Sequence, residues 1–381
     1  MAVTTAASEV ASGAPEGPWT VEASTAPGAT SQLSGVSAVP GASWAVGSSL
    51  VAGRQRALVL KRRGSAWSPQ TIPHAKGNNE LLAVKATSGS NAWAVGDHSG
   101  ANGMGVLILH WNGSAWSIQS APRDGFSACG SAPCSYGLEA IAALSKSNAW
   151  AVGSHACFAI ECHELTLVEH WDGHSWKIQP SPNESELSEL TSVTAWNNTH
   201  VWAAGTDRSG VVAGQATGFV ERWAGSKWRL VHTPQPGFAT ELNGISAVSA
   251  TNVWAVGGYT PSQHAEEKTL ILHWNGSTWR RVTSPNVGSR RFNDLQAVKV
   301  ISADNVWAVG SYVTKSPGVQ QTLIEHYDGR SWSIVASPNA GTFDNALSAI
   351  AGVSSTRLFA VGVSSQDTDG TATSPLVLHC C

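Results

Sequence analysis

Residues 242–285 read LNGISAVSATNVWAVGGYTPSQHAEEKTLILHWNGSTWRRVTSP, and this stretch decides the fold. It holds four short runs rich in β-branched and aromatic residues, separated by turn-forming residues, and no run keeps a helical period. The Asn275-Gly276 pair between the last two runs favours a tight hairpin, because both residues tolerate a positive φ. The stretch therefore predicts one sheet of four strands.

The same unit recurs along the whole chain. Trp-Ala-Val-Gly, or a close variant of it, starts at Trp44, Trp93, Trp150, Trp202, Trp254, Trp307 and Phe359. A second motif follows, such as the His-Trp-Asn-Gly-Ser-Ala-Trp sequence that ends at Trp116. A regular period of about 50 residues with four strand-length runs per unit is typical of a β-propeller. The sequence thus predicts an all-β, seven-bladed propeller with four-stranded blades.

The two ends of the chain complement each other. The seventh unit, residues 347–381, stops one strand short, and residues 17–24 supply a strand that belongs to no other unit. We expect the N-terminal strand to complete the C-terminal blade, which closes the ring and removes an open sheet edge. This assigns residues 15–381 to a single propeller and residues 1–14 to a flexible tail.

Composition excludes several classes of protein. The chain has 381 residues, a net charge of -3 and only 13% charged residues. Binding to nucleic acid through a basic face needs clustered Lys and Arg, so we expect no nucleic-acid partner. No apolar run is long enough for a transmembrane helix. The aromatic content and low charge also argue against extensive disorder.

Most aromatic residues and the repeated histidines have structural explanations. Seventeen of the 18 Trp fall at three positions of the repeat, which predicts packing between neighbouring blades, and only Trp196 lies outside the pattern, where we expect it to pack against a turn. The histidines that share one position are expected to bond to backbone; they are His110, His170, His273, His326 and His379, with Lys61 and Arg222 in the other two units.

Sequence variation concentrates at one end of the blades. The connections between the second and third strands and between successive blades all leave from the same face, which we call the top face. The long, irregular ones lie within residues 99–105, 154–164, 206–217, 259–268, 312–320 and 364–374. Variable loops on a rigid scaffold usually carry binding residues, so we expect a ligand on the top face.

Four acids occupy one position at the top of the innermost strand. They are Glu80, Glu189, Glu241 and Asp294, with Gln32, Gly137 and Ala346 at that position in the other units. Three explanations stay open for this partial ring: hydrogen bonding within the loops, binding of a divalent cation or polar ligand, and general acid and base catalysis. Two carboxylates at a suitable separation would serve glycoside cleavage.

Other polar loop residues are weaker candidates. His155, His163 and His264 would join the acids in proton transfer, and a ligand would contact His98, Asp207, Tyr259 and Tyr312. No nucleophile elbow, zinc-protease motif, phosphate-binding loop or dinucleotide fingerprint supports a specific reaction. The presence of most of these polar side chains is explained equally well by exposure of the loops to solvent, without a role in binding or catalysis.

The cysteines lie in three groups. Cys129 and Cys134 precede the third unit, Cys157 and Cys162 lie in its next top loop, and Cys380 and Cys381 end the chain. The first four favour disulfides, either within each loop or between the loops, and a zinc site that adds His163 is the alternative. Cys380 and Cys381 form a vicinal disulfide or remain thiols. Paired cysteines and low charge predict an extracellular or cell-surface protein, although residues 1–8 lack the pattern of a signal peptide.

The repeat, Trp-Ala-Val-Gly followed by an apolar strand and Asp-Gly-x-x-Trp, resembles propellers of the Asp-box and photosystem II assembly factor type. It resembles more closely a Trp-Ala-Val-Gly repeat class of secreted soil-bacterial proteins. The resemblance covers residues 17–381 and implies the fold. It implies no activity, because the arginine triad and tyrosine nucleophile of sialidases that share such boxes have no counterpart here.

Three functional hypotheses follow. The first is an extracytoplasmic propeller that binds a glycan or cell-surface polymer, or a small molecule, with its top loops. The second is a polysaccharide lyase or glycoside hydrolase that acts at the central top funnel. The third is a scaffold for protein–protein interaction. The oligomeric state is left open.

Overall fold

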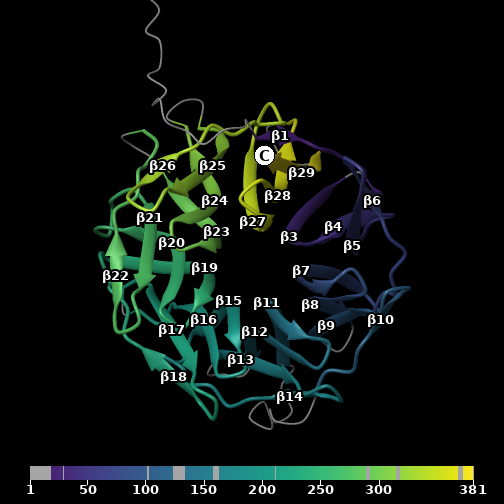
Figure 1. The fold of residues 1–381 in the computed structure, drawn as a ribbon, viewed down its shortest axis with the longest axis horizontal. Coiled ribbons are helices and arrows are strands. Elements are labelled where there is room, and N and C mark those ends of the chain that lie inside the picture. The colour runs from purple at the N-terminus through teal and green to yellow at the C-terminus, as the bar shows by residue number, and fades with distance from the viewer. Residues whose placement is uncertain are drawn as a thin grey trace, which may run out of the picture.

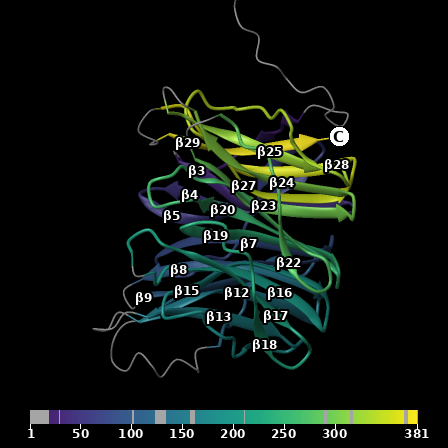
Figure 2. The ribbon, with the colours of Figure 1, turned by 90° about the vertical axis from the view of Figure 1, so that its left-hand side faces the viewer.

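Seven antiparallel sheets stand around a central axis and form a closed ring (Figure 1). The computed structural model describes residues 19–28, 30–100, 103–122, 134–157, 163–210, 212–288, 292–314, 318–367 and 372–380. Seen from the side, the ring is a thick disc in which the strands run between two faces (Figure 2). The fold is therefore the seven-bladed β-propeller that the repeat predicts.

Five blades use four consecutive strands each, with the innermost strand first. Blade two consists of β7 (Asn78–Ser88), β8 (Asn91–Gly100), β9 (Gly103–Trp111) and β10 (Trp116–Ile118). Blade three consists of β11 (Cys134–Ser145), β12 (Asn148–Cys157), β13 (Glu164–Trp171) and β14 (Trp176–Ile178). Blade four consists of β15 (Ser188–Asn197), β16 (His200–Asp207), β17 (Thr217–Trp223) and β18 (Trp228–Val231).

Blades five and six continue this order. Blade five consists of β19 (Ala239–Ser249), β20 (Asn252–Thr260), β21 (Lys268–Trp274) and β22 (Trp279–Val282). Blade six consists of β23 (Asn293–Ser302), β24 (Asn305–Val313), β25 (Gln320–Tyr327) and β26 (Trp332–Ile334). No helix in the described part of the chain is long and apolar enough to cross a membrane.

The first and last blades share the N-terminal segment. Blade one contains β3 (Ser31–Val39), β4 (Ala42–Val51), β5 (Arg54–Arg63) and β6 (Ala66–Pro69), and blade seven contains β27 (Asn345–Ser354), β28 (Arg357–Ser365) and β29 (Thr373–Cys380). The outermost strand of blade seven is β1 (Thr20–Val21), in which Thr20 pairs with His379. Trp19 is 3% exposed and packs edge-on against Trp307 at 5.7 Å. These contacts confirm the predicted ring closure.

The N-terminal segment also fastens blade one, which the sequence did not suggest. Its next strand, β2 (Ala23–Ser24), pairs in parallel with β6 and gives blade one a fifth strand. Between the two short strands, the buried carboxylate of Glu22 accepts hydrogen bonds from Arg62 at 2.6 Å and from Trp67 Nε1 at 2.7 Å. His379 of blade seven lies 3.8 Å from the same carboxylate. Glu22 therefore clasps the two blades together.

Tryptophans fill the spaces between blades. The ring of Trp93 in blade two contacts Trp171 and Trp176 in blade three, each at 5.2 Å between centroids. Equivalent contacts recur where Trp150, Trp202 and Trp254 meet the following blade. Each such aromatic pair contributes about 1 kcal/mol beyond the burial of its area. The packing role predicted for the repeated Trp is confirmed, whereas Trp196 is 48% exposed at the end of β15 and does not pack into the core.

The repeated histidines bond to side chains, not to the backbone as predicted. His110 Nε2 lies 2.8 Å from Asn91 Oδ1, and its ring lies over Trp93 at 4.1 Å. The same pair of contacts recurs for His170, His273 and His326. In the two units without His, Lys61 and Arg222 lie over the rings of Trp44 and Trp202, so a cation replaces the stacked imidazole.

Two glycine positions explain why the motifs are constant. A Cβ at Gly96, in the Trp-Ala-Val-Gly motif of blade two, would overlap the carbonyl oxygen of Glu80 on the inner strand. In the hairpin after β21, Gly276 has a φ of 99°. Contrary to the prediction, Asn275 does not adopt a positive φ; its side-chain oxygen instead accepts the backbone N–H groups of Ser277 and Thr278, each at 3.0 Å.

Candidate functional site: the central channel and its acidic mouth

A channel runs through the centre of the ring. Its cavity of about 460 Å³ is lined by the innermost strand of every blade. Every inner strand has a β-bulge or irregularity just after its buried leucine, and runs of consecutive residues, such as Thr191 to Ala195, line the cavity. The channel-facing set differs from blade to blade, unlike the repeated leucines and tryptophans of the core.

The four acids predicted at the top of the inner strand occupy one level of the ring. Each precedes a fully buried leucine, as Glu80 precedes Leu81 and Glu241 precedes Leu242. They are joined by acids from the top ends of other strands and loops. We call the whole group the acidic mouth; its members are Glu80, Asp97, Glu139, Glu164, Glu189, Glu241, Glu267 and Asp294.

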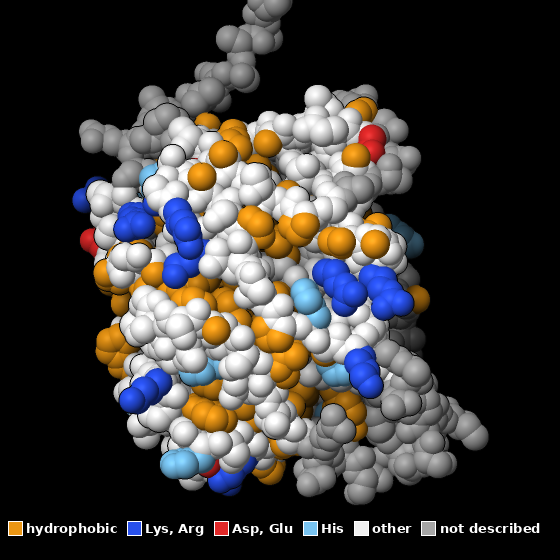
Figure 3. Space-filling model, turned by 90° about the vertical axis from the view of Figure 1, so that its right-hand side faces the viewer, with side chains coloured by type: hydrophobic (Ala, Val, Ile, Leu, Met, Phe, Trp, Pro, Cys, Tyr) orange, Lys and Arg blue, Asp and Glu red, His pale blue; other side chains and the backbone are white. Residues whose placement is uncertain are grey.

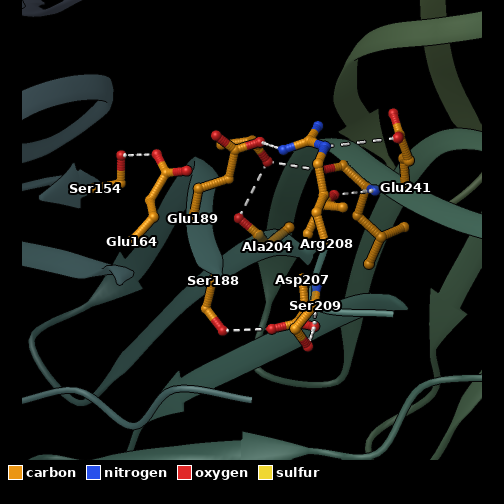
Figure 4. A network of polar contacts seen from close by, with 12 residues as sticks. Ser154, Glu164, Ser188, Glu189, Ala204, Asp207, Arg208, Ser209 and Glu241 are labelled. Carbon is orange, nitrogen blue, oxygen red and sulfur yellow. Dashed lines mark hydrogen bonds and ion pairs between the residues drawn. The ribbon is translucent and has the colours of Figure 1, made fainter. Parts of the chain in front are cut away.

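Arg208 bridges two of these acids (Figure 4). Its Nη1 donates a hydrogen bond to Glu189, and its Nε lies 3.9 Å from Glu241 in the next blade. Burial alone would lower the pKa of Arg208, but the hydrogen bond and charge of Glu189 raise it. On the other side of Glu189, the carboxylate of Glu164 accepts a hydrogen bond from Ser154 at 2.7 Å. Among the described residues, Arg208 is the only cation in ion-pair contact with the acidic mouth.

Asp294 and Glu267 form a second pair at the mouth. Both oxygens of Asp294 accept from Asn243 Nδ2 at 3.1 Å, and Gln296 donates a further hydrogen bond. Burial and the nearby charge of Glu267 nevertheless raise the pKa of Asp294 to about 8. Burial and the charge of Glu241 raise the pKa of Glu267 to about 7. Near neutral pH both carboxyl groups are therefore partly protonated.

Glu80 and Asp97 face each other across β7 and β8. Gln55 of blade one donates a hydrogen bond to Glu80, and burial together with the charge of Glu80 raises the pKa of Asp97 to about 6. Glu139 lines the channel itself, just below. Burial raises its pKa to about 7, with contributions from Glu189, Asp97, Glu80 and Glu164.

Glu139 does not occupy the position that the four predicted acids share in their blades. At that position blade three has Gly137, and Glu139 stands two residues further along β11. A β-bulge between Leu138 and Ala140 takes Glu139 out of the regular alternation of β11, so spacing along the strand gave no signal for it. Arg208 was missed because a lone cation in a variable loop has no pattern.

The remaining predicted residues lie apart from one another. Asp207 is 5% exposed and accepts hydrogen bonds from Ser188 and Ser209, at 2.8 and 2.6 Å. Tyr259 is buried, with Arg281 over its ring at 4.2 Å. Tyr312 packs, half-buried, against the core between blades five and six.

The four histidines of the top loops lie apart from one another. His98 lies across from Gly105 on β9, and His155 is buried against Tyr136 at 6.3 Å. His163 lies 3.5 Å from Glu186, and His264 is exposed in the loop before β21. The structure therefore brings the predicted acids together, but within the described part of the chain it gathers no group of histidines beside them.

The described residues include only some of the cysteines for which disulfides or a metal site were predicted. Cys134 and Cys157 lie directly opposite each other on β11 and β12, while Cys129 and Cys162 fall outside the described residues. Cys380 is buried at the end of β29 and is disulfide-bonded. Within the described ranges, no group of three or more His, Cys, Asp or Glu has the arrangement of a metal site. A divalent cation at the mouth stays a prediction.

The outer surface has the opposite electrostatic character over blades one and two. In this view Lys and Arg side chains are spread across the face and acidic side chains are rare (Figure 3). The strand β5 alone carries Arg54, Arg56, Lys61, Arg62 and Arg63. The basic side chains of this outer face contrast with the carboxyl groups of the acidic mouth.

Comparison with known proteins supports the fold. No protein-family model and no curated protein matches the chain. Among solved structures, YCF48 bound to D1 peptide is similar with a TM-score of 0.55 and 14% identity, covering 96% of this chain and 98% of that one. YCF48 from Cyanidioschyzon merolae is similar with a TM-score of 0.54 and 15% identity, covering 95% and 98%.

A third match is PorZ of Porphyromonas gingivalis, described as a bacterial surface component of the type-IX secretion system. It has a TM-score of 0.53 and 13% identity, and the match covers 91% of this chain and 46% of PorZ. At these identities the likeness is one of fold. The YCF48 matches support the propeller type that the repeat motifs indicated.

Proposed function

We propose that this chain is a binding protein whose acidic mouth holds a positively charged peptide segment of a partner protein. The observation that carries the proposal is the convergence of eight carboxyl groups on one opening, with one arginine in contact with them. Such a surface attracts Lys and Arg side chains and repels acidic ones.

The mutual repulsion of these acids favours a cationic ligand. Crowding and burial hold the pKa values of Glu139 and Glu267 at about 7 and that of Asp294 at about 8. An ammonium or guanidinium group placed among them offsets the repulsion, and the bound acids release protons. The same charge would be far weaker as a recognition element on an open surface, where solvent and salt screen it.

The structural neighbours favour a peptide as the ligand. One YCF48 structure contains D1 peptide, so a propeller of similar architecture takes a peptide. This supports the scaffold hypothesis among the three that the sequence suggested. The peptide identity cannot be carried over at 14% identity, and the charge preference proposed here comes from the residues of this chain alone.

The glycan hypothesis has less support from the described residues. Sugar binding commonly uses exposed aromatic rings as stacking surfaces, yet Tyr259 is buried beneath Arg281 and Tyr136 packs against His155. Glycan or polymer binding therefore stays a prediction, best tested with polymers that carry amino groups. An extracytoplasmic location is likewise our proposal, and it rests on the cysteine pairs and the low charge of the sequence.

One specific observation supports the hydrolase or lyase hypothesis. Asp294, with a pKa of about 8, is protonated at neutral pH and lies within electrostatic reach of Glu241. A protonated acid beside a second carboxyl group has the character of a general acid with its partner. If polysaccharides are cleaved, Asp294→Asn should abolish the cleavage, and release of reducing ends from a polymer panel measures it.

Calorimetric titration with designed peptides tests the binding proposal. A Lys- and Arg-rich peptide should bind, while peptides of the same length rich in Ala or Glu should not. Glu189→Gln with Glu241→Gln should weaken binding about tenfold or more, and Glu184→Gln, an exposed acid outside the mouth, should leave it unchanged. Equal affinity for the three peptides, or an unchanged affinity in the double variant, would overturn the proposal.

A further inference from the structure

The channel contains a second charged level below the acidic mouth. Lys85 on β7 and Lys299 on β23 occupy equivalent positions, each five residues after a mouth acid, Glu80 or Asp294. They pair with Trp93 and Trp307, the equivalent tryptophans of the second strands. At a strand rise of about 3.3 Å per residue, this level lies roughly 15 Å further along the channel. The two lysines come from blades two and six and both line the cavity.

Neither ammonium group has a partner among the described residues. No described acid forms an ion pair with Lys85 or Lys299, and no hydrogen bond joins either one to a neighbour. Burial lowers the pKa of Lys85, and burial together with the charge of Lys85 lowers that of Lys299 to about 8. When both lysines are protonated, two like charges lie in this sheltered space, and no acid among the described residues is in ion-pair contact with either.

Hydroxyl groups complete this level of the channel. Thr194 and Ser246 stand at the same position in blades four and five, and both line the cavity. Each hydroxyl oxygen accepts a backbone N–H group of the next blade at 3.2 Å, from Ala247 and from Val300 respectively. A hydroxyl that accepts in this way keeps its own proton, so it can donate a further hydrogen bond.

We propose that Lys85, Lys299, Thr194 and Ser246 form a binding site for a small oxyanion inside the channel. Two ammonium groups supply the charge, and the hydroxyls supply neutral donors, which is the donor set that a phosphoryl or carboxylate group requires. Bound there, the anion offsets the repulsion between the lysines. The acidic mouth repels anions, and the site works independently of the peptide proposed above.

Thermal unfolding of the whole chain in phosphate or acetate, against chloride at equal ionic strength, tests this site. Phosphate represents phosphoryl ligands and acetate represents carboxylates. At concentrations well above Kd, the preferred anion should raise the Tm of the wild type by about 2 °C or more. Lys85→Gln with Lys299→Gln should lose this increase, while its Tm in chloride stays equal to or above that of the wild type.

Two controls separate the site from general salt effects and from the mouth. Lys227→Gln, at an exposed lysine, should keep the full anion-dependent increase, and Glu189→Gln with Glu241→Gln, which removes two repelling charges at the mouth, should keep or exceed it. The single variant Lys85→Met provides the same comparison if the double variant fails to fold. Titration of the anion by calorimetry should show at least tenfold weaker binding in either lysine variant. No protection by either anion, or equal protection of the lysine variants, would overturn the proposal.

Discussion

The spaces between the blades and the wall of the channel differ in how far their residues repeat from one blade to the next. Between blades, the same residues recur: a tryptophan such as Trp202 lies against the aromatic pair Trp274 and Trp279 of the next blade. Along the channel, one equivalent position holds Ser, Leu, Glu, Thr, Asn or Gln in different blades, as Leu82, Glu139 and Asn243 illustrate. Repetition therefore marks residues that build the ring, and departure from repetition marks residues available for recognition.

The buried carboxyl groups sharpen this contrast. Glu221 and Glu325 lie on third strands between blades and are fully buried, and no hydrogen-bond partner of their carboxyl oxygens is present in the described structure. The acids of the mouth are linked to one another, to Arg208 and to amide side chains. An acid in the first setting affects stability, whereas an acid in the second affects what the channel binds.

The largest loss of stability is expected from removal of a repeated aromatic residue. Trp202→Ala should lower the free energy of unfolding by about 4 kcal/mol, because it leaves a cavity between two blades. Denaturant unfolding measures this. The matched variant Trp196→Ala, at a half-exposed tryptophan outside the repeat, should cost less than about 0.5 kcal/mol. Similar losses in both variants would contradict the distinction between repeated and unrepeated positions.

Loss of the Glu22 clasp should have the next largest effect. Glu22→Gln leaves Arg62 partly buried without its charge partner, at a cost of about 3 kcal/mol. Burial raises the pKa of Glu22, but the hydrogen bonds from Arg62 and Trp67 together lower it by more, so the folded pKa lies below the usual value. The stability that this group contributes is present above its unfolded pKa and is lost as the pH falls through its folded pKa. Acid unfolding curves of the variant should therefore flatten relative to the wild type.

Glu221 should produce the reverse pH dependence. Burial raises its pKa from 4.5 to about 9, so its contribution to stability is fully present below about 4.5 and is lost as the pH rises toward 9. Across that window the free energy of unfolding should fall by about 1.4 kcal/mol per pH unit for this one group. Glu221→Gln should remove that slope and be the more stable protein at pH 9. Parallel stability curves for wild type and variant between pH 6 and 9 would show that the carboxyl group ionises freely in the folded state.

Sequence reasoning recovered the architecture because every unit repeats it. Seven copies of one motif fix the blade number, the strand order and the ring closure through residues 19–21. The parallel strand Ala23–Ser24 escaped prediction, since two residues carry too little pattern to show that a second blade is joined.

At the site, the sequence located Glu80, Glu189, Glu241 and Asp294 on one level, and the structure links them. It could not assign their partners. Arg208, Glu267 and Asn243 reach the mouth through tertiary contacts that no local spacing encodes. The raised pKa values likewise depend on burial and on acids from other blades, which a single strand does not reveal.

The most direct test of the account is the affinity of a Lys-rich peptide measured against pH. Asp97, Glu139 and Glu267 have pKa values of about 6, 7 and 7, so they gain charge as the pH rises through this range. The account predicts binding about tenfold tighter at pH 8 than at pH 5.5, with proton release on binding and a smaller pH dependence in Glu139→Gln with Glu267→Gln, in which Asp97 and Asp294 still titrate. An affinity that is constant across this range, or that weakens as the pH rises, would contradict it.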